Sequence, residues 1–408
     1  MKGLMGVATL VAISFNFAQA QIENVCSIND YKSLVACAEK KSAEIKLSEQ
    51  KITSTSKLED AARQWDNPDL DLESVSKGSD VSEKSATLLF NVPLGGKRSA
   101  RIDEAKAEHR KSVIENQFQI QSSRLALTLA FYRLSHLTKE IKIEQESVDT
   151  FNKIVKQYQG RKALSPEQDV SLEVFKMALS DHQFNLNKLR SESEKIILEL
   201  KAVTGIDKDV ILKHLPPAKS NWQKVESEEN VLNSPQVQVA QAEVELSKSQ
   251  NDRAKADTWP DLKIGPTIQE SKSGNETEKL AGVSLSMPLP ILSFNGGNRD
   301  YTKEKMRESQ MSLELTKQKL NAYRKQLTEK YNSTVLILKS VIDSKTIASK
   351  HVKIEQQFFK GVVNSSLIIE AHRQLFDLES RRNEAELEAL ESLGQLLIID
   401  NKFNEVVL

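Results

Sequence analysis

One motif occurs twice in this chain, about 195 residues apart, and this repeat constrains the fold more than any other feature. The first copy begins with Asn-Pro-Asp-Leu at 67–70 and ends with Pro-Leu-Gly-Gly-Lys-Arg at 93–98. The second begins with Trp-Pro-Asp-Leu at 259–262 and ends with Pro-Leu-Pro at 288–290, then Gly-Gly-Asn-Arg at 296–299. A long-period repeat is usually one structural unit used twice, so we expect two equivalent halves.

The stretches inside each motif copy alternate apolar and polar residues, as strands do. The clearest examples read Asp-Leu-Asp-Leu-Glu at 69–73 and Val-Ser-Leu-Ser-Met at 283–287. The repeat divides the chain after residue 20 into halves at 21–220 and 221–408. Each half should contribute two strands, and the four are expected at about 69–76, 84–93, 261–269 and 281–288.

Long helical segments flank both motif copies. Charged residues make up 28% of the chain and aromatic residues only 5%, a composition typical of long helices with heptad seams. The helices should reverse at two hairpin turns, at about 160–166 and 360–366, with an irregular connector at 207–233 between the halves. We expect helices at about 30–65, 97–159, 166–204, 234–258, 298–359 and 366–399.

The first residues predict export. Lys2, a short apolar run and Ala-Gln-Ala at 18–20 have the pattern of a secretory signal peptide over 1–20. After residue 20 no apolar stretch approaches the ~20 residues of a spanning helix. In an oxidising compartment Cys26 and Cys37 could form a disulfide, but only if the chain before Asn29 folds back, because on one helix they would stand ~16 Å apart. The pairing and N-terminal lipidation both stay open at this point.

The strand pattern fits either a membrane barrel or a half-buried sheet in a soluble sandwich. Taken alone it favours the sandwich, because single barrel strands carry weak signals. The export signal, the shortage of other β sequence and the doubling of the motif shift the balance to a barrel. Since membrane barrels use eight or more strands, four cannot close one, and an open sheet in lipid would leave backbone groups unpaired. Three copies with four strands each would give a twelve-stranded barrel.

The two predicted hairpin turns match each other. Tyr-Gln-Gly160 corresponds to Phe-Lys-Gly361, and nine residues after each glycine stands an acid, Asp169 or Glu370. Either acid could simply stabilise the start of the following helix. In a rotationally symmetric tube the same acid would form a ring that favours cations. We favour the helix-start interpretation for Asp169 and the ring for Glu370. His372 lies near the same tip, where a packed or solvated helix residue is the more ordinary interpretation.

With these residues in view, the chain resembles the TolC-like outer-membrane efflux family, and within it the CzcC-like branch that exports heavy-metal cations. The most specific match is Pro-Leu-Gly95-Gly96-Lys97-Arg98 with Arg101, similar to that branch's strand-to-helix junction. Pro-Leu-Pro-Ile-Leu at 288–292 with Gly296 and Gly297 is similar to the second junction. The resemblance covers about residues 30–399.

The resemblance implies a mainly α fold with a small β part. Long helical hairpins would form a periplasmic barrel, and four strands per protomer would join a twelve-stranded barrel of a homotrimer in outer-membrane lipid. It implies a passive exit duct that meets a periplasmic adaptor and an inner-membrane pump, here of the RND type. The implied residues are Gly160 and Gly361 at the adaptor-docking tips, Glu370, Asp169 and His372 at the tip or gate, and Gly95, Gly96, Lys97, Arg98, Gly296 and Gly297 at the barrel–tunnel junction.

Sequence patterns for catalysis are missing. The chain has no nucleophile elbow, phosphate-binding loop or dinucleotide fingerprint, and no two of its six histidines stand at i, i+4 on one helix. We therefore expect no enzyme activity, no cofactor and no metal site. The 57 acidic and 57 basic residues are interleaved, which gives no reason to expect a nucleic-acid partner. Open alternatives are a duct for drugs or for type I protein secretion, a periplasmic adaptor, and a purely structural coiled coil.

Overall fold

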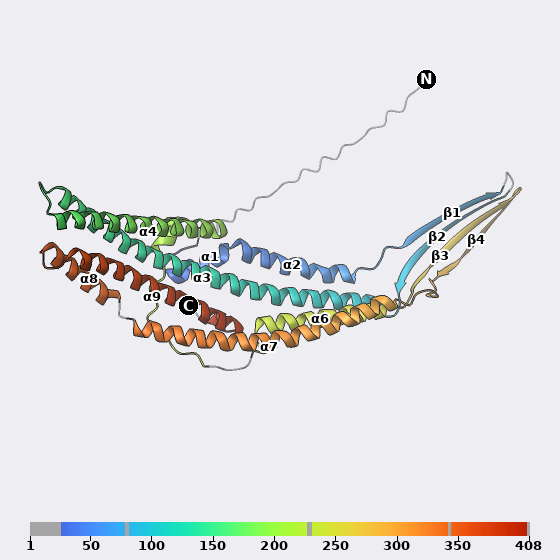
Figure 1. The fold of residues 1–408 in the computed structure, drawn as a ribbon. Helices are drawn as coiled ribbons and strands as arrows, with labels where there is room; N and C mark the ends of the chain where they lie inside the picture. The colour runs from blue at the N-terminus through green and yellow to red at the C-terminus, as the bar shows by residue number, and fades with distance from the viewer. Residues whose placement is uncertain (1–25, 78–80, 227–230, 342–343, 406–408) are drawn as a thin grey trace, which may run out of the picture.

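The structure is a computed structural model that describes residues 26–77, 81–226, 231–341 and 344–405. Long helices run side by side along one axis, and a four-stranded sheet projects from one end (Figure 1). The helical elements are α1 (Tyr31–Lys41), α2 (Ala43–Arg63), α3 (Lys97–Gln159), α4 (Pro166–Thr204), α5 (Lys208–Lys213), α6 (Pro235–Ala256), α7 (Gly296–Ser340), α8 (Ser344–Phe359), α9 (Ser365–Ile399) and the 3₁₀ turn η1 (Phe403–Glu405). The predicted signal peptide lies outside the described residues.

The sheet is antiparallel with strand order β1-β2-β3-β4. The strands are β1 (Asp69–Lys77), β2 (Val81–Pro93), β3 (Asp261–Ser273) and β4 (Glu276–Ser286). All four begin or end close to the predicted positions, but β2, β3 and β4 are longer than expected. The central β2–β3 pairing joins the two motif copies, so residues from opposite halves of the chain lie at the middle of the sheet.

The first predicted helix is interrupted, and the expectation of one helix over 30–65 was wrong. Ser42 ends α1 with its backbone N–H donating to the Ala38 carbonyl at 2.8 Å. Its hydroxyl then accepts from the Ile45 N–H at 3.4 Å and caps α2. Serine can compete with helical backbone hydrogen bonds in this way, and nothing in the heptad pattern marks the break.

The expectation of one helix over 298–359 was also wrong. Helix α7 ends at Ser340, and Val341 takes extended backbone angles (φ −74°, ψ 135°) before α8 begins at Ser344. The Ser340 hydroxyl donates to the Ile337 carbonyl at 2.8 Å, a local bond that competes with the helix ladder. The matching helix of the first half, α3, runs without interruption over 63 residues, or roughly 95 Å at 1.5 Å per residue.

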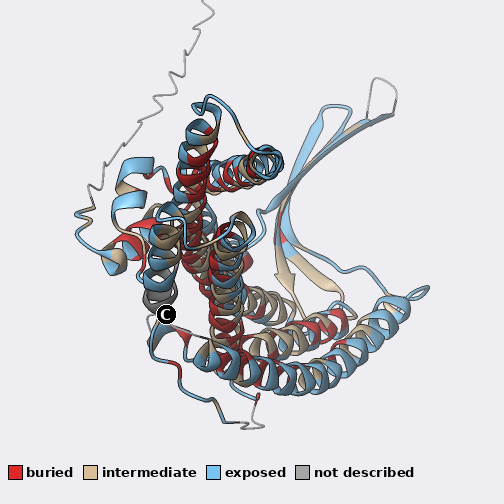
Figure 2. Cartoon of the chain, turned by 60° about the vertical axis from the view of Figure 1, so that its left-hand side comes forward, coloured by how far each residue is buried: buried red, intermediate tan, exposed pale blue. Residues whose placement is uncertain are grey.

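The hydrophobic core lies in the helical part. Figure 2 shows buried residues concentrated among the helices, whereas the sheet is exposed or half-buried along most of its length. Close to the hairpin turns, which lie at the end away from the sheet (Figure 1), Phe151 and Phe175 pack with Ile368 and so join α3, α4 and α9. Two further clusters, around Phe131 and around Tyr331, fill the middle of the helical part.

A disulfide joins Cys26 to Cys37, with Cα atoms 5.8 Å apart. Residues 26–30 fold back along α1 to make this possible, the arrangement that the spacing of the two cysteines requires. No described helix is both long enough and apolar enough to cross a membrane.

Candidate functional site: the sheet faces, the junction and the hairpin tips

One face of the sheet is apolar across all four strands. The register places Leu70 opposite Leu88, and Ile264 opposite both Phe90 and Leu285. Because directly opposed residues share a face, the apolar side chains of every strand lie together. Leu72 is 72% exposed and Val283 is 74% exposed, so this face is open. The apolar face comprises Leu70, Leu72, Ala86, Leu88, Phe90, Ile264, Pro266, Ile268, Ala281, Val283 and Leu285.

The opposite face is mainly polar. Asp71 lies opposite Thr87, and the hydroxyls of Thr87 and Thr267 are 2.8 Å apart. Lys263 Nζ reaches across β2 to Asp69 Oδ2 at 2.7 Å. The apolar exceptions are Leu89, which is buried, and Val75, Val81 and Leu280, which are exposed at the end of the sheet away from the helices. A sheet with one apolar and one polar face, both largely exposed, can separate an apolar medium from water.

Glycine is required at one point in this sheet. A Cβ atom added to Gly265 would lie 1.7 Å from the Leu88 carbonyl oxygen, so β2 and β3 approach too closely there for any side chain. The next residue, Pro266, has no N–H to offer a neighbouring strand. The close approach lies between the two halves of the chain, and the motif gave no indication of it.

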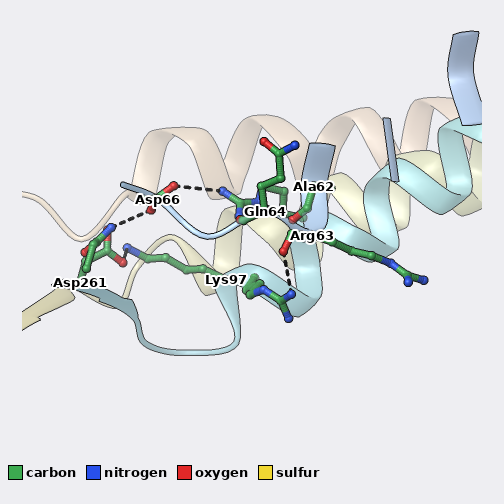
Figure 3. Close-up of polar contacts among 9 residues, drawn as sticks. Ala62, Arg63, Gln64, Asp66, Lys97 and Asp261 are labelled. Carbon is green, nitrogen blue, oxygen red and sulfur yellow. Dashed lines mark hydrogen bonds and ion pairs between the residues drawn. The ribbon is translucent and has the colours of Figure 1, made fainter. Parts of the chain in front are cut away.

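The first strand-to-helix junction holds the sheet to the helices (Figure 3). Gly95 and Gly96 have φ of 64° and 76°, the left-handed region that favours glycine. The Trp259 ring lies where a Gly95 side chain would be, with Cδ1 2.2 Å from an added Cβ. Lys97 Nζ pairs with Asp261 Oδ1 at 2.7 Å and so ties the start of α3 to the start of β3.

Two arginines at this junction cap the end of α2. Arg98 donates to the Arg63 carbonyl at 2.7 Å, and Arg101 donates to the Ala62 and Gln64 carbonyls at 3.0 and 2.7 Å. The last carbonyls of a helix have no partner within it, and cations there also complement the helix dipole. Lys97 and Arg98, singled out from sequence, therefore fix the geometry where strands become helices.

The second junction differs from the first. Gly296 and Gly297 open α7, but the left-handed residue there is Asn295, with φ of 55°. Asn295 Nδ2 donates to the Ala254 carbonyl at 3.0 Å, which anchors the junction to the end of α6. The motif copies thus reach similar topology by different local contacts.

The two tip glycines also differ. Gly361 has φ of 75°, and the Val362 N–H bonds the Gln357 carbonyl at 3.0 Å while the Gly361 N–H bonds that of Phe358 at 2.9 Å. This is the Schellman arrangement that glycine favours. Gly160 keeps a right-handed conformation with φ of −77°. Their placement at the tips follows the sequence prediction, while adaptor docking remains a prediction.

Glu370 and Asp169 lie in different electrostatic environments. Asp169 is exposed in the first turn of α4. Both Glu370 oxygens accept from the Arg373 guanidinium, at 2.8 and 3.0 Å, and Gln374 Nε2 donates at 2.6 Å. These hydrogen bonds, Arg373 first, lower the pKa of Glu370. The positive charge of Arg373 partly neutralises this carboxylate. It would therefore weaken the attraction of a Glu370 ring for cations.

His372 does not have the environment of a gate residue. Its side chain is 0% exposed, and a ring nitrogen lies 2.9 Å from the Ser147 hydroxyl. The Phe151 ring packs on it, with centroids 4.9 Å apart. The structure therefore supports the packed-helix interpretation of His372 and contradicts its assignment to an aqueous gate.

His372 belongs to a buried polar seam that the sequence prediction missed. On α3, polar residues recur at 136, 140, 144 and 147, a spacing that places them on one helix face. His136 Nε2 lies 3.3 Å from Glu386 Oε2, Asn383 donates to Glu140 at 2.8 Å, and His182 lies 2.7 Å from Glu144. We call this set the α3–α9 seam, which His182 joins from α4: His136, Glu140, Glu144, Ser147, His182, His372, Asn383 and Glu386.

Two carboxylates of the seam are shifted in opposite directions. Burial alone would raise the pKa of Glu386, but the nearby His136 ring and the hydrogen bond from the Lys219 N–H bring it below its ordinary value. Burial raises the pKa of Glu140, although Asn383 and Arg133 oppose this. The ionised form is therefore favoured at Glu386 and disfavoured at Glu140. No group of three or more His, Cys, Asp and Glu within the described ranges has an arrangement that could hold a metal ion.

No family model matches the chain, and no curated protein matches it in sequence. Solved structures do match. The CmeC outer membrane channel of Campylobacter jejuni is 12% identical, with 91% of this chain and 86% of that chain covered and a TM-score of 0.69. The open state of the MtrE outer membrane channel of Neisseria gonorrhoeae is 14% identical, with coverage of 91% and 89% and a TM-score of 0.67. The outer membrane protein VceC of Vibrio cholerae is 14% identical, with coverage of 89% and 96% and a TM-score of 0.62. The chain has the fold of these proteins.

Proposed function

We propose that this chain is the outer-membrane exit duct of a tripartite efflux system. The observation that carries the proposal is the sheet register, which gathers most of the exposed apolar side chains of the four strands on one face. In contact with lipid, the apolar face is removed from water. The opposite face, which carries Asp71 and Thr87, then lines a water-filled lumen. The likeness in fold to outer membrane channels supports the same function.

The duct is a homotrimer in this proposal. Strands β1 and β4 are the edges of the described sheet, and an edge in lipid leaves its N–H and C=O groups without partners. Three copies with four strands each close a twelve-stranded barrel, within the range of known membrane barrels. The long helices would continue the barrel as a periplasmic tube, with the tips at Gly160 and Gly361 meeting an adaptor protein.

The energy for export would come from an inner-membrane pump. The family resemblance of the chain points to a pump of the RND type. Heavy-metal cations are the proposed substrate, supported by the resemblance of the Gly95-Gly96-Lys97-Arg98 junction to the metal-exporting branch. A duct for drugs or for type I protein secretion is the alternative. A periplasmic adaptor is a weaker alternative, since this fold has two long helical hairpins and one small sheet.

Outer membranes from cells that express the chain test the proposal. Without heating, the protein should migrate in detergent gels as a trimer that boiling converts to monomers, and the purified trimer should conduct ions in planar bilayers. An adaptor or a structural coiled coil predicts neither result. Monomeric protein in the soluble periplasmic fraction would overturn the proposal.

A further inference from the structure

We propose that the loop at residues 288–295, between β4 and α7, docks against the segment around Trp65 in a second copy of this chain. The inference rests on the proposed homo-oligomeric duct and identifies a contact that would seal it where barrel and tube meet. The partner is a neighbouring protomer, and the contact is head-to-tail.

The loop is unusually apolar for an exposed segment. Leu292 is 100% exposed, and Leu289, Ile291 and Phe294 are each more than half exposed. Single exposed apolar residues are ordinary, but four large ones within six positions form a patch typical of an interaction site.

The patch is held in place. Pro288 and Pro290 restrict the backbone at its start, and the Ile291 N–H bonds the Leu289 carbonyl at 2.8 Å. At its end, Asn295 is anchored to the Ala254 carbonyl. The loop therefore presents its apolar side chains in a fixed arrangement, which lowers the entropic cost of docking.

The sheet topology identifies what lies beside the loop in a closed barrel. Strand β4 ends at Ser286, opposite Lys263, and Lys263 contacts Asp69 at the start of β1. The end of β4 and the start of β1 thus lie at one level on opposite edges of the sheet. Closure by several copies places β4 of one protomer beside β1 of the next, because these are the two edges. The loop after β4 then meets the residues just before β1.

The chain already contains a template for this contact. Inside one protomer, the segment after β2 meets the segment before β3 in the same relative positions. There the Trp259 ring packs over Gly95, and Lys97 pairs with Asp261 at 2.7 Å. Since the motif repeats, the segment after β4 and the segment before β1 are the second set of such partners, but they lie on opposite edges and can meet only between copies.

The second junction has an additional apolar segment that the first lacks, and this segment is available for the proposed contact. Leu94 is followed directly by Gly95, whereas residues 290–295 separate Leu289 from Gly296 and carry most of the exposed patch. The facing segment offers Trp65, which is 63% exposed although the Arg98 guanidinium lies 5.0 Å from its ring centroid. An aromatic side chain with one face covered by a cation and much of its surface open is a suitable partner for Leu292.

Cysteine cross-linking in isolated outer membranes tests the contact. Both natural cysteines are in the disulfide, so a Leu292→Cys, Trp65→Cys variant has the engineered thiols as its only free ones. A short bismaleimide should convert it to covalent dimers and trimers, and Phe294→Cys with Trp65→Cys should behave alike. Each single variant should stay monomeric on boiling, because a head-to-tail contact never brings a residue to its own copy.

An edge pair separates failure of this contact from failure of the closed sheet. Leu70→Cys with Leu285→Cys reports whether β1 and β4 of different copies are neighbours. If the edge pair cross-links and both loop pairs do not, the barrel stands and the docking contact is wrong. Labelling of Leu292→Cys by a lipid-soluble maleimide in the assembled trimer would likewise overturn it, with lipid as the occupant. If the edge pair also does not cross-link, the closed barrel of the proposed function is wrong, and the docking contact that rests on it is wrong with it.

Discussion

The sheet and the α3–α9 seam depart from the usual burial pattern in opposite ways. In the sheet, large apolar side chains are exposed, as with Leu285 at 66%. In the seam, ionisable side chains are buried, as with Glu144 at 0%. A soluble protein minimises both situations, because exposed apolar area and buried charge each cost free energy.

The two regions differ in where the compensating partners come from. Seam carboxylates find partners within the same chain, such as His182 for Glu144 and His136 for Glu386. The apolar sheet face finds none in the described chain, so its partner must come from outside, and lipid is the partner we propose. We therefore expect the seam to lose stability when one of its partner residues is removed. We expect the sheet to lose membrane insertion when the polarity of its apolar face is changed.

The largest effect is expected on the sheet. Leu285→Asp places a charge on the apolar face, where a basic residue costs about 2–4 kcal/mol near the bilayer midplane and an acidic one somewhat less, and this cost is repeated in each protomer. Membrane-inserted trimer should be nearly absent. Ser284→Asp is the matched control, because the neighbouring residue points to the polar face. Quantification of trimer in outer membranes checks both variants, and equal yields would remove the lipid-facing assignment.

The second-largest effect is expected in the seam, on the free energy of unfolding. Glu386→Ala removes the buried carboxylate that contacts His136 and accepts from the Lys219 N–H, which should lower the free energy of unfolding by roughly 3–5 kcal/mol. Glu386→Gln keeps an acceptor oxygen and should lose less. Chemical denaturation of the helical part, followed by circular dichroism, measures the difference. If the Ala and Gln variants unfold at the same denaturant concentration, the contacts of Glu386 with His136 and with the Lys219 N–H do not stabilise the seam.

The alternation of the strands and the helical hairpins could be predicted from the sequence, because both follow from local periodicity. The breaks at Ser42 and Val341 could not, since a serine hydroxyl that bonds locally leaves the heptad pattern intact. The seam was missed for a different reason. His136 and Glu386 are 250 positions apart, and only the packing of α3 on α9 shows that they are partners. The isolated polar positions on α3 were a usable signal, as their spacing follows one helix face.

The pH dependence of the seam should separate its two shifted carboxylates. The pKa of Glu386 is lowered in the folded state, so its stabilisation is present above its ordinary pKa of 4.5 and is lost as the pH falls through the folded value. The pKa of Glu140 is raised, so its ionisation costs stability as the pH rises above 4.5.

Substitution by glutamine should therefore have opposite signs at neutral pH. Glu140→Gln should stabilise the fold by about 1 kcal/mol, and Glu386→Gln should destabilise it by a similar amount. Both differences from the natural chain should shrink as the pH approaches 4. Denaturation midpoints at pH 7 and pH 4 test this. Changes of the same sign in the two variants would contradict the assigned directions.

The smallest effect on assembly is expected at the tip. Glu370 is charged and its side chain is 40% exposed, so its substitution neither buries a charge nor exposes apolar area. If three Glu370 side chains line a constriction, Glu370→Ala should reduce cation selectivity and multivalent-cation block in planar bilayers, with trimer yield unchanged. Arg373 partly neutralises this carboxylate, so Arg373→Gln should increase cation selectivity instead. Asp169→Ala is the control, because its exposed carboxylate at the start of α4 is assigned only to the helix dipole. Equal permeability ratios in the Glu370, Arg373 and Asp169 variants would leave Glu370 as a helix residue paired with its neighbour, and the acidic ring would have to be abandoned.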